Sequence, residues 1–192
     1  MKRASTTVIL VTALYLVGCA PTLPPQSEIR PSYSIADVKT FSSVLDCANT
    51  QTTELRAGFV KDYCEVLAGN IKLAMHQENR NFTQNEVNPD LVVQTTLEEI
   101  HGGSAAARFW VGFGAGRSIT TVYVKVLKNE NIIAERRITE TTTMPNLATS
   151  TYSNEDAILQ DAPLIARKIG EFVHDPVEFE KKQNPSDDDI NR

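Results

Sequence analysis

The sequence contains few of the residues that most often carry out chemistry. It has three histidines and three cysteines in 192 residues. His76, His101 and His174 do not have the spacing of metal ligands, so we expect no metal centre. The cysteines form no Cys-x-x-Cys pair, which argues against a redox enzyme. We therefore expect a protein that is not an enzyme and uses no cofactor.

The sequence also lacks an excess of positive charge and a long hydrophobic run. Lys and Arg number 19 against 24 Asp and Glu, a net charge of −5, which argues against nucleic acid as a partner. The apolar run Val8–Val17 has ten residues, broken only by Thr12. A helix that crosses the hydrocarbon core needs roughly 20 residues. No other run is long enough, so we expect no membrane-spanning helix.

The first residues have the layout of a secretory signal, residues 1–18, with Lys2 and Arg3 before the apolar run and small residues before Cys19. The junction Leu16-Val17-Gly18-Cys19 resembles the lipobox of bacterial lipoproteins. This resemblance implies that the chain is cut before Cys19, which then carries a diacylglycerol on its thiol and an N-acyl chain on its new amine. The alternative is an ordinary signal with a chance cysteine.

The lipid would anchor the protein firmly, because each buried CH₂ group contributes about 0.8 kcal/mol and two or three chains act together. Ala20 follows the lipidated cysteine where an aspartate would favour the inner membrane. By resemblance to enteric lipoproteins, this implies the outer membrane, and we expect its periplasmic face. Loss of the signal removes Lys2 and Arg3, so the mature chain is more acidic than the precursor.

Proline-rich and acidic stretches flank the predicted domain. Residues 19–32, with Pro21, Pro24 and Pro25, are typical of a semi-rigid spacer that would lift the domain off the bilayer. Residues 178–192 are charged and predict an acidic, disordered tail, with a docking role as the alternative. Residues 33–177 between them predict one domain, large enough to bury its own core.

Two cysteines remain once Cys19 is assigned to lipid. Cys47 and Cys64 are an even pair in a compartment that favours disulfides, so we expect a bond between them. The bond would close a loop of 17 residues, which the chain-entropy model values at about 3 kcal/mol. A reactive thiol is the alternative.

Hydrophobic periodicity predicts the order strand, helix, three strands, helix. Part of the range 34–45 predicts a first strand, and apolar residues spaced by three and four predict a helix over about 53–77. A period of two predicts strands over 91–101, 119–127 and 132–143, the last two joined as a hairpin. A final apolar stripe predicts a helix that begins near Ser153 or Asp161 and ends at Asp175-Pro176, with Pro163 inside the pattern. This order is typical of an α+β two-layer sandwich, with helices on one face of a mainly antiparallel sheet.

Residues 102–117 hold five of the nine glycines, the only tryptophan and two of the seven phenylalanines. A phosphate-binding loop is one interpretation, but a β-branched strand follows where a helix should begin. A hairpin whose aromatic residues fill the core is the second. The third is a partner or membrane contact, because aromatic residues and arginine are enriched at such surfaces. The contact is assigned to Arg108, Phe109, Trp110, Gly112, Phe113, Gly114, Gly116 and Arg117.

The segment Gly-Ser-Ala-Ala-Ala-Arg-Phe-Trp-Val-Gly-Phe-Gly-Ala-Gly-Arg, residues 103–117, and the hairpin after it resemble domain-of-unknown-function family 4410. The likeness runs from about Tyr33 to Val173 and departs from the family at the turn 128–131, where Asp and Gly are usual. Members of this family are bacterial envelope proteins, often lipoproteins. The resemblance implies no reaction and therefore no catalytic residues.

These observations predict an outer-membrane-anchored periplasmic lipoprotein that acts as a non-enzymatic accessory or assembly subunit of a cell-envelope complex. Its partners would be the membrane, through the lipid anchor, and an envelope protein or a second copy of the chain. The first alternative is a periplasmic module that binds a small ligand or a lipid between sheet and helices. A hydrolase that uses one of the three histidines is a further alternative.

Overall fold

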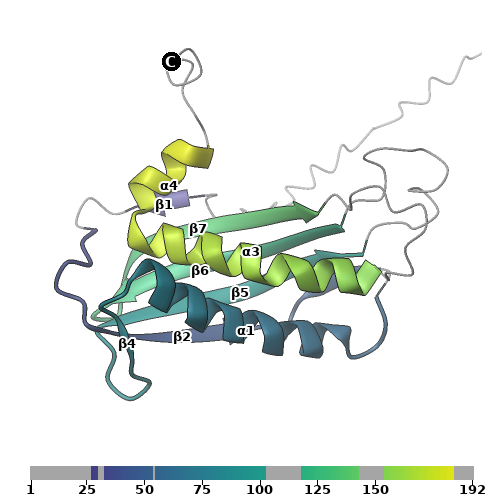
Figure 1. Cartoon of the computed structure of the whole chain (residues 1–192), viewed down its shortest axis with the longest axis horizontal. Helices are drawn as coiled ribbons and strands as arrows, with labels where there is room; N and C mark the ends of the chain where they lie inside the picture. Colours follow the sequence, from purple (N-terminus) through teal and green to yellow (C-terminus); the bar gives the residue numbers. More distant parts are fainter. Residues whose placement is uncertain (1–26, 30–32, 54, 103–117, 143–153, 184–192) are drawn as a thin grey trace, which may run out of the picture.

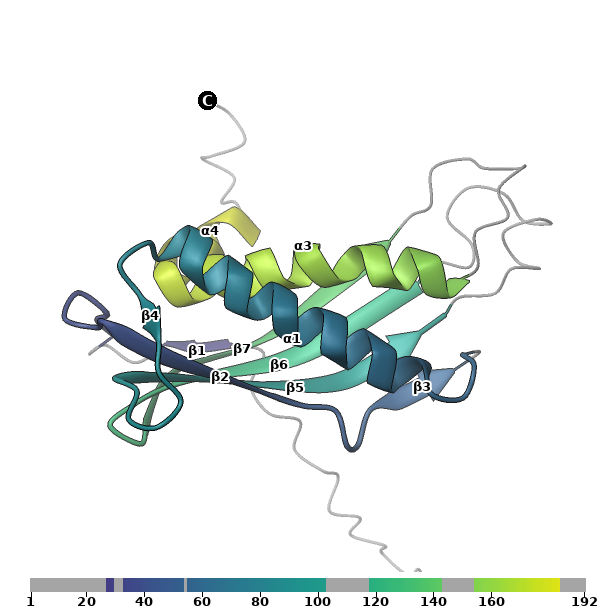
Figure 2. The same ribbon diagram turned by 60° about the horizontal axis from the view of Figure 1, so that its bottom comes forward.

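The chain folds into a two-layer α+β sandwich, as the periodicity predicts. The computed structural model describes residues 27–29, 33–53, 55–102, 118–142 and 154–183. In these residues one open sheet carries helices α1 (Phe59–Glu78) and α3 (Asn154–His174) on one face (Figure 1). The view turned by 60° confirms that both helices lie on the same side of the sheet (Figure 2).

The sheet has seven strands in the described residues, and most of its pairing is antiparallel. The strands are β1 (Ser27–Ile29), β2 (Thr40–Asp46), β3 (Gln51–Thr53), β4 (Thr83–Gln84), β5 (Leu91–His101), β6 (Ser118–Lys128) and β7 (Asn131–Thr142). Their order is β1-β7-β6-β5-β2-β4, and β3 also pairs with β5. The pairs β1–β7, β7–β6 and β6–β5 are antiparallel, whereas β2 runs parallel to β5 because α1 crosses over between them.

The hairpin of β6 and β7 turns at Asn129 and Glu130, both of which have positive φ, 50° and 65°. A tight hairpin turn of this kind matches the twist of the strands and favours Asn or Gly. Asn129 suits its position, whereas Glu130 occupies a left-handed conformation that a longer side chain rarely adopts. The turn therefore forms although its residues depart from the usual pair.

The hydrophobic core lies between the helices and the sheet. Predicted stripe residues on both helices are buried, including Phe59, Leu67 and Ile71 on α1 and Ile165 and Ile169 on α3. Val122, Val124 and Val126 face them from β6 and are fully buried. Val66 is the exception in the first stripe, since 41% of it is exposed. The apolar residues that recur every 3.6 positions in the helices thus pack against those that recur every second position in the strands, as a two-layer fold requires.

The two long helices run parallel and pack closely near their C-terminal ends. A Cβ atom on Gly170 of α3 would lie 3.1 Å from the carbonyl oxygen of Ala74 on α1. Only a residue without a side chain allows this approach without a shift of the backbone. Pro163 lies inside α3, and the helix continues through it from Asn154, which confirms the predicted start near Ser153 and excludes the alternative start at Asp161.

The starts of the first strand and the first helix have local reasons. The first strand begins at Thr40, within the predicted range 34–45, because Val38 N donates to Ile35 O across a turn at 3.0 Å. The first helix begins at Phe59 instead of residue 53, after Gly58 with φ of +87°. The residues Gln51–Thr53 form β3 beside β5, since their polar, β-branched sequence suits a sheet edge.

The ordered domain is longer at both ends than the predicted 33–177. β1 falls within the predicted spacer 19–32 and pairs with β7. Helix α4 (Pro176–Gln183) falls within the predicted disordered tail 178–192 and buries Phe179, which stacks edge-on against Phe172. Both elements are too short for a periodic signal, and each depends on contacts with distant residues.

Candidate functional site

The structure describes some of the predicted site residues. Cys47 and Cys64 are described, and they form the predicted disulfide. Cys19 and the predicted contact residues lie outside the described residues: Arg108, Phe109, Trp110, Gly112, Phe113, Gly114, Gly116 and Arg117. Their roles therefore stay predictions, and the structure instead defines the part of the fold from which the glycine-aromatic segment leaves and to which it returns.

Both ends of this segment are fixed in the sheet. β5 pairs with β6 as far as the partners His101 and Ile119, so the strand ends on either side are neighbours. Gly102 N donates to Thr53 O at 3.1 Å, which continues the pairing with β3. His101 Nδ1 lies 2.5 Å from Thr53 Oγ1, and its Nε2 contacts Glu99. The glycine-aromatic segment thus follows a strand end that hydrogen bonds hold in place.

Helices α1 and α3 begin at the same end of the sandwich, which we call the helix-start end (Figure 1). Arg56, just before α1, holds the two beginnings together. Its backbone N and its Nε donate to the carboxylate of Glu155 at 2.8 and 2.7 Å, and its guanidinium also donates to Asp62 at 2.6 Å. Because two acidic partners favour its charged form, the pKa of Arg56 is raised.

A cluster of buried and partly buried polar side chains lies under the helix-start end. It comprises Tyr63 of α1, Thr120 of β6, Glu140 of β7 and Asp161 of α3. Thr120 and Glu140 are register partners, so their side chains share one face of the sheet. Tyr63, Thr120 and Asp161 are completely buried. Within the described residues, neither carboxylate oxygen of Asp161 has a hydrogen-bond partner.

Electrostatics in this cluster oppose the charged form of Asp161. Burial raises its pKa to about 7, and the nearby negative charge of Glu140 adds to the shift. Glu140 itself has a cation, since Lys168 Nζ lies 2.6 Å from its Oε2. Burial also raises the pKa of Tyr63, with a further contribution from Asp161. A buried carboxyl without partners is uncommon and marks either a functional site or a local energetic cost.

The sequence analysis missed this cluster, although it contained a signal. Asp161 lies on the apolar stripe of α3, beside Ile158, Ala162 and Ile165, where a charged residue is out of place. Thr120 likewise continues the buried face of Val122 and Val124. A polar residue at an apolar position of the repeat was the available sign. The four residues of the cluster come together only when the helices pack against the sheet.

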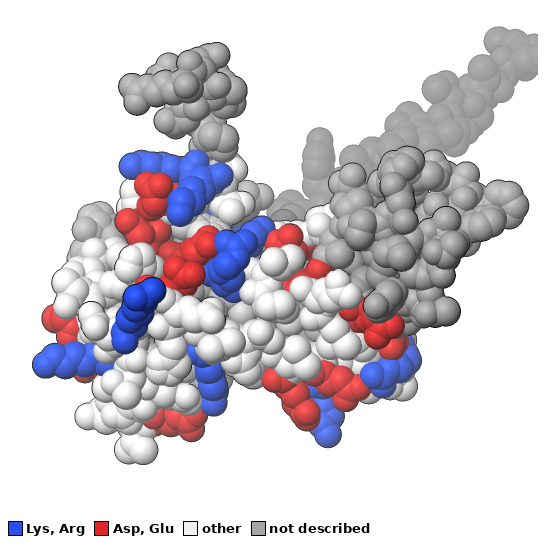
Figure 3. Space-filling view, viewed as in Figure 1, with Lys and Arg blue, Asp and Glu red and all other residues white. Residues whose placement is uncertain are grey.

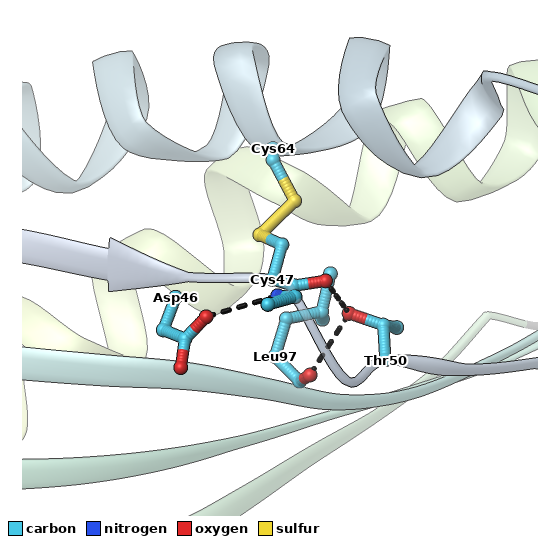
Figure 4. The surroundings of a disulfide bond; sticks show 6 residues. Asp46, Cys47, Thr50, Cys64 and Leu97 are labelled. Atoms are coloured by element: carbon cyan, nitrogen blue, oxygen red, sulfur yellow. Dashed lines mark hydrogen bonds between the residues drawn. A yellow bond between two sulfur atoms is a disulfide. The ribbon is translucent and has the colours of Figure 1, made fainter.

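The disulfide joins α1 to the turn after β2 (Figure 4). Thr50 Oγ1 lies 2.9 Å from the carbonyl oxygen of Cys47 and 3.0 Å from that of Leu97 in β5, so its hydroxyl hydrogen bridges turn and sheet. Asp46 Oδ1 accepts from Ala48 N at 2.9 Å on the other side of the turn. The bond therefore attaches the helix to a turn that is itself fastened to the central sheet.

A shallow groove of about 440 Å³ lies beside this disulfide, between α1 and β2. Leu45, Cys47, Val60, Cys64 and Ala68 line it, with Lys61 and Glu65 at its rim. Its volume falls at the small end of ligand-binding sites, and its wall is almost entirely apolar. The groove is the feature of the described residues that fits the ligand-binding alternative.

The sheet face opposite the helices carries a polar network. Arg137 of β7 donates from two nitrogens to the carboxylate of Glu98 at 2.6 and 2.9 Å. The Tyr123 hydroxyl donates to Glu135, and Lys125 Nζ lies 5.3 Å from the centre of the Tyr123 ring. These charges are paired on the sheet. This face of the sheet therefore carries paired charges of both signs.

The histidines have roles that packing explains. His76 Nδ1 lies 3.0 Å from Phe82 O, and His174 Nδ1 lies 3.0 Å from Asn79 Oδ1. His76 thus joins α1, and His174 joins α3, to the residues that follow α1. Among the described residues, no three metal-binding side chains come together and no helix is long and apolar enough to cross a membrane. On the helix-bearing side, acidic and basic groups alternate without a patch of one sign (Figure 3).

Comparison with known proteins relates the chain to a family whose function is not defined. The model of the domain of unknown function DUF4410 matches residues 42–153. This range includes the central strands, α1 and the glycine-aromatic segment, and it is shorter than the span from Tyr33 to Val173 expected from the sequence. No curated protein matches the chain.

Several solved structures have a distantly similar fold. PelC from Paraburkholderia phytofirmans, a dodecamer, is 11% identical with a TM-score of 0.44 over 73% of this chain and 94% of PelC. A DUF330 protein from Xanthomonas campestris is 11% identical with a TM-score of 0.48 over 82% of this chain and 94% of that one. A minor lipoprotein from Acinetobacter baumannii is 14% identical with a TM-score of 0.35 over 70% and 94% of the two chains.

Proposed function

The chain belongs to the DUF4410 family of domains of unknown function, and we propose that it is an outer-membrane lipoprotein on the periplasmic side that serves as a non-enzymatic accessory or assembly subunit of a cell-envelope complex. Cys19 would carry the lipid. The glycine-aromatic segment, with Phe109, Trp110 and Phe113, would contact the partner, which is another envelope protein or a second copy of the chain.

One observation carries the contact role of this segment. β5 and β6 are paired to their ends at His101 and Ile119, so a turn of about two residues would connect them. The chain instead has residues 103–117 between these strand ends, including its only tryptophan. Connections longer than about 12–15 residues are uncommon in compact domains and usually serve a function. The length of this connection favours the contact interpretation.

The disulfide supports the envelope location. Such bonds persist in oxidising compartments such as the bacterial periplasm and are rare in the cytosol. Cys47 and Cys64 are both partly buried and bonded to each other, so neither thiol is available for a redox reaction. The predicted signal, the lipobox-like junction and the disulfide thus all favour the periplasm.

Cys19→Ala is expected to release the protein from the membrane. Without the thiol no diacylglycerol can be attached, and each lost acyl CH₂ removes about 0.8 kcal/mol of membrane affinity. The measurement is the fraction of protein that sediments with outer membranes, together with the mass of the N-terminal peptide. Cys64→Ala serves as the matched control, since it removes a cysteine and should leave the protein in the membrane fraction. An unlipidated wild-type peptide would contradict the proposal.

A photoreactive residue at Trp110 is expected to cross-link to one discrete envelope protein, or to a second copy, in living cells. Interfaces concentrate their binding energy in aromatic and arginine residues, so the Trp110→Ala, Phe113→Ala double variant should lose the partner and keep its melting temperature. Mass spectrometry of the adduct identifies the partner. A matched probe at Val87, which is 95% exposed, should give no such adduct. Unchanged partner recovery with the double variant would contradict the contact role.

The groove beside the disulfide favours one second candidate, a module that binds a small apolar ligand or a lipid chain. Its apolar lining is open to solvent at Leu45, Val60 and Ala68. Lipid retained through purification and lost in an Ala68→Arg variant would support this candidate. Protein purified without any bound lipid, together with a Trp110 adduct, would exclude this candidate and support the accessory-subunit proposal.

A further inference from the structure

β1 ties the start of the described chain to the edge of the sheet. Ser27, Glu28 and Ile29 pair in antiparallel register with Arg136, Glu135 and Ala134 of β7. This pairing places the N-terminal part of the mature chain at the β7 edge, one end of the strand order β1-β7-β6-β5-β2-β4. The described part of the domain therefore includes Ser27, six residues before the predicted boundary at residue 33.

The remaining tether is short. Eight peptide units separate Cys19 from Ser27. A fully extended chain of that length spans at most about 28 Å, and a proline-rich one about 25 Å. With Cys19 lipidated, Ser27 cannot lie farther than this from the headgroups. Three residues of the spacer predicted to lift the domain off the bilayer, Ser27–Ile29, thus belong to the sheet.

Helix α4 lies over the same edge and contacts it through Arg136. Arg136, the register partner of Ser27, forms an ion pair with Glu180 of α4, and its guanidinium lies 5.0 Å from the Phe179 ring centre. Lys181 and Lys182 at the end of α4 are exposed, and basic side chains project over this helix in the space-filling view (Figure 3). Exposed lysines near a bilayer attract anionic headgroups.

We propose that the edge formed by β1, β7 and α4 faces the bilayer, and that a lipid headgroup surface is its partner. The inference rests on the proposed lipidation of Cys19 and adds the orientation of the domain. Five strand spacings of about 4.8 Å place the β2–β4 edge roughly 24 Å farther from the membrane. The disulfide groove, between α1 and β2, then lies on the side away from the bilayer and is open to periplasmic molecules.

Energy transfer to labelled lipids tests this orientation. The lipidated full-length protein is placed in vesicles of phosphatidylethanolamine and phosphatidylglycerol that contain an acceptor dye on the headgroup. A fluorescent amino acid replaces Val177 of α4 in one sample and Val87, between β4 and β5, in the other. These residues are 52% and 95% exposed, so neither change should disturb the fold. We expect transfer from position 177 to be several-fold larger than from position 87.

A longer tether provides the second arm. About ten Gly and Ser residues inserted after Ala20 add roughly 17 Å of root-mean-square reach, so transfer from position 177 should fall while the protein still floats with vesicles. Equal or reversed transfer from the two positions, or no effect of the insert, would overturn the orientation. An N-terminal peptide without acyl mass, or protein that fails to float, would instead overturn the proposed lipidation.

Discussion

Asp161→Asn is expected to stabilise the protein at about pH 8 by roughly 1–4 kcal/mol, because each unit of pKa shift corresponds to about 1.4 kcal/mol. Asp161 is completely buried, its pKa is raised to about 7, and within the described chain neither of its oxygens accepts a hydrogen bond. At pH 8 the native state must therefore hold a buried charge close to Glu140. Asparagine has nearly the same volume, carries no charge and can donate to the oxygens around it.

The pH dependence has a defined sign. The unfolded carboxyl has a pKa of about 3.9, whereas the folded one has a pKa of about 7. Between these values the native state holds a proton that the unfolded state has released, so this group's stabilisation is full below about pH 4 and is lost as the pH rises to about 7. Asp90 has the opposite sign: backbone N–H groups of Lys39 and Thr40 lower its pKa, so its contribution is lost in acid.

Urea unfolding followed by circular dichroism at about pH 5 and about pH 8 measures this difference. The advantage of Asp161→Asn over wild type should grow from the lower to the higher pH. Asp156→Asn is the matched control, because it removes the same charge from an exposed position on α3 and should show no such growth. A variant that is less stable than wild type at both pH values would mean that the carboxylate has favourable partners.

Removing the disulfide is expected to lower the stability by about 3 kcal/mol. The bond closes a loop of 17 residues and holds α1 on the turn after β2, so the Cys47→Ala, Cys64→Ala double variant frees the unfolded chain and loosens this attachment. For a domain of this size the melting temperature should fall by roughly 6–12 °C. Differential scanning calorimetry of the double variant and of wild type measures the change.

Wild-type protein kept reduced separates the effect of the disulfide bond on the melting temperature from the effect of the two substituted side chains. It should melt close to the double variant, since both lack the covalent link, and the reductant should not affect the double variant. An unchanged melting temperature in the double variant would show that the Thr50 hydrogen bonds to Cys47 and Leu97 hold the turn without the disulfide.

The long elements could be predicted because their signals are local. The buried stripe of Ile158, Ala162 and Ile165 and the alternation of Val122, Val124 and Val126 follow from the repeat of each element. The disulfide could be predicted as well, because its evidence is a count of cysteines and a compartment. The predicted roles of Cys19 and of the segment around Trp110 remain predictions, since these residues lie outside the described chain.

The short elements could not be predicted in the same way. β1, β3 and β4 have two or three residues each, too few for a period of two to be visible. α4 has one buried aromatic residue, Phe179, in an otherwise charged sequence, and Arg136 on a distant strand decides its position. These elements form because a neighbouring edge offers hydrogen bonds or an apolar surface, which a local pattern does not contain.

The sequence by itself determined the fold class, the family resemblance, the pairing of Cys47 with Cys64 and the prediction of a lipid-anchored envelope protein. Hydrophobic periodicity and short motifs are properties of consecutive residues, so they are present before the chain folds. Only the tertiary structure decided that Tyr63, Thr120 and Asp161 are buried together beside Glu140 and that β1 pairs with the distant strand β7. Both depend on residues that are distant in sequence and are brought together by the packing of helices on the sheet.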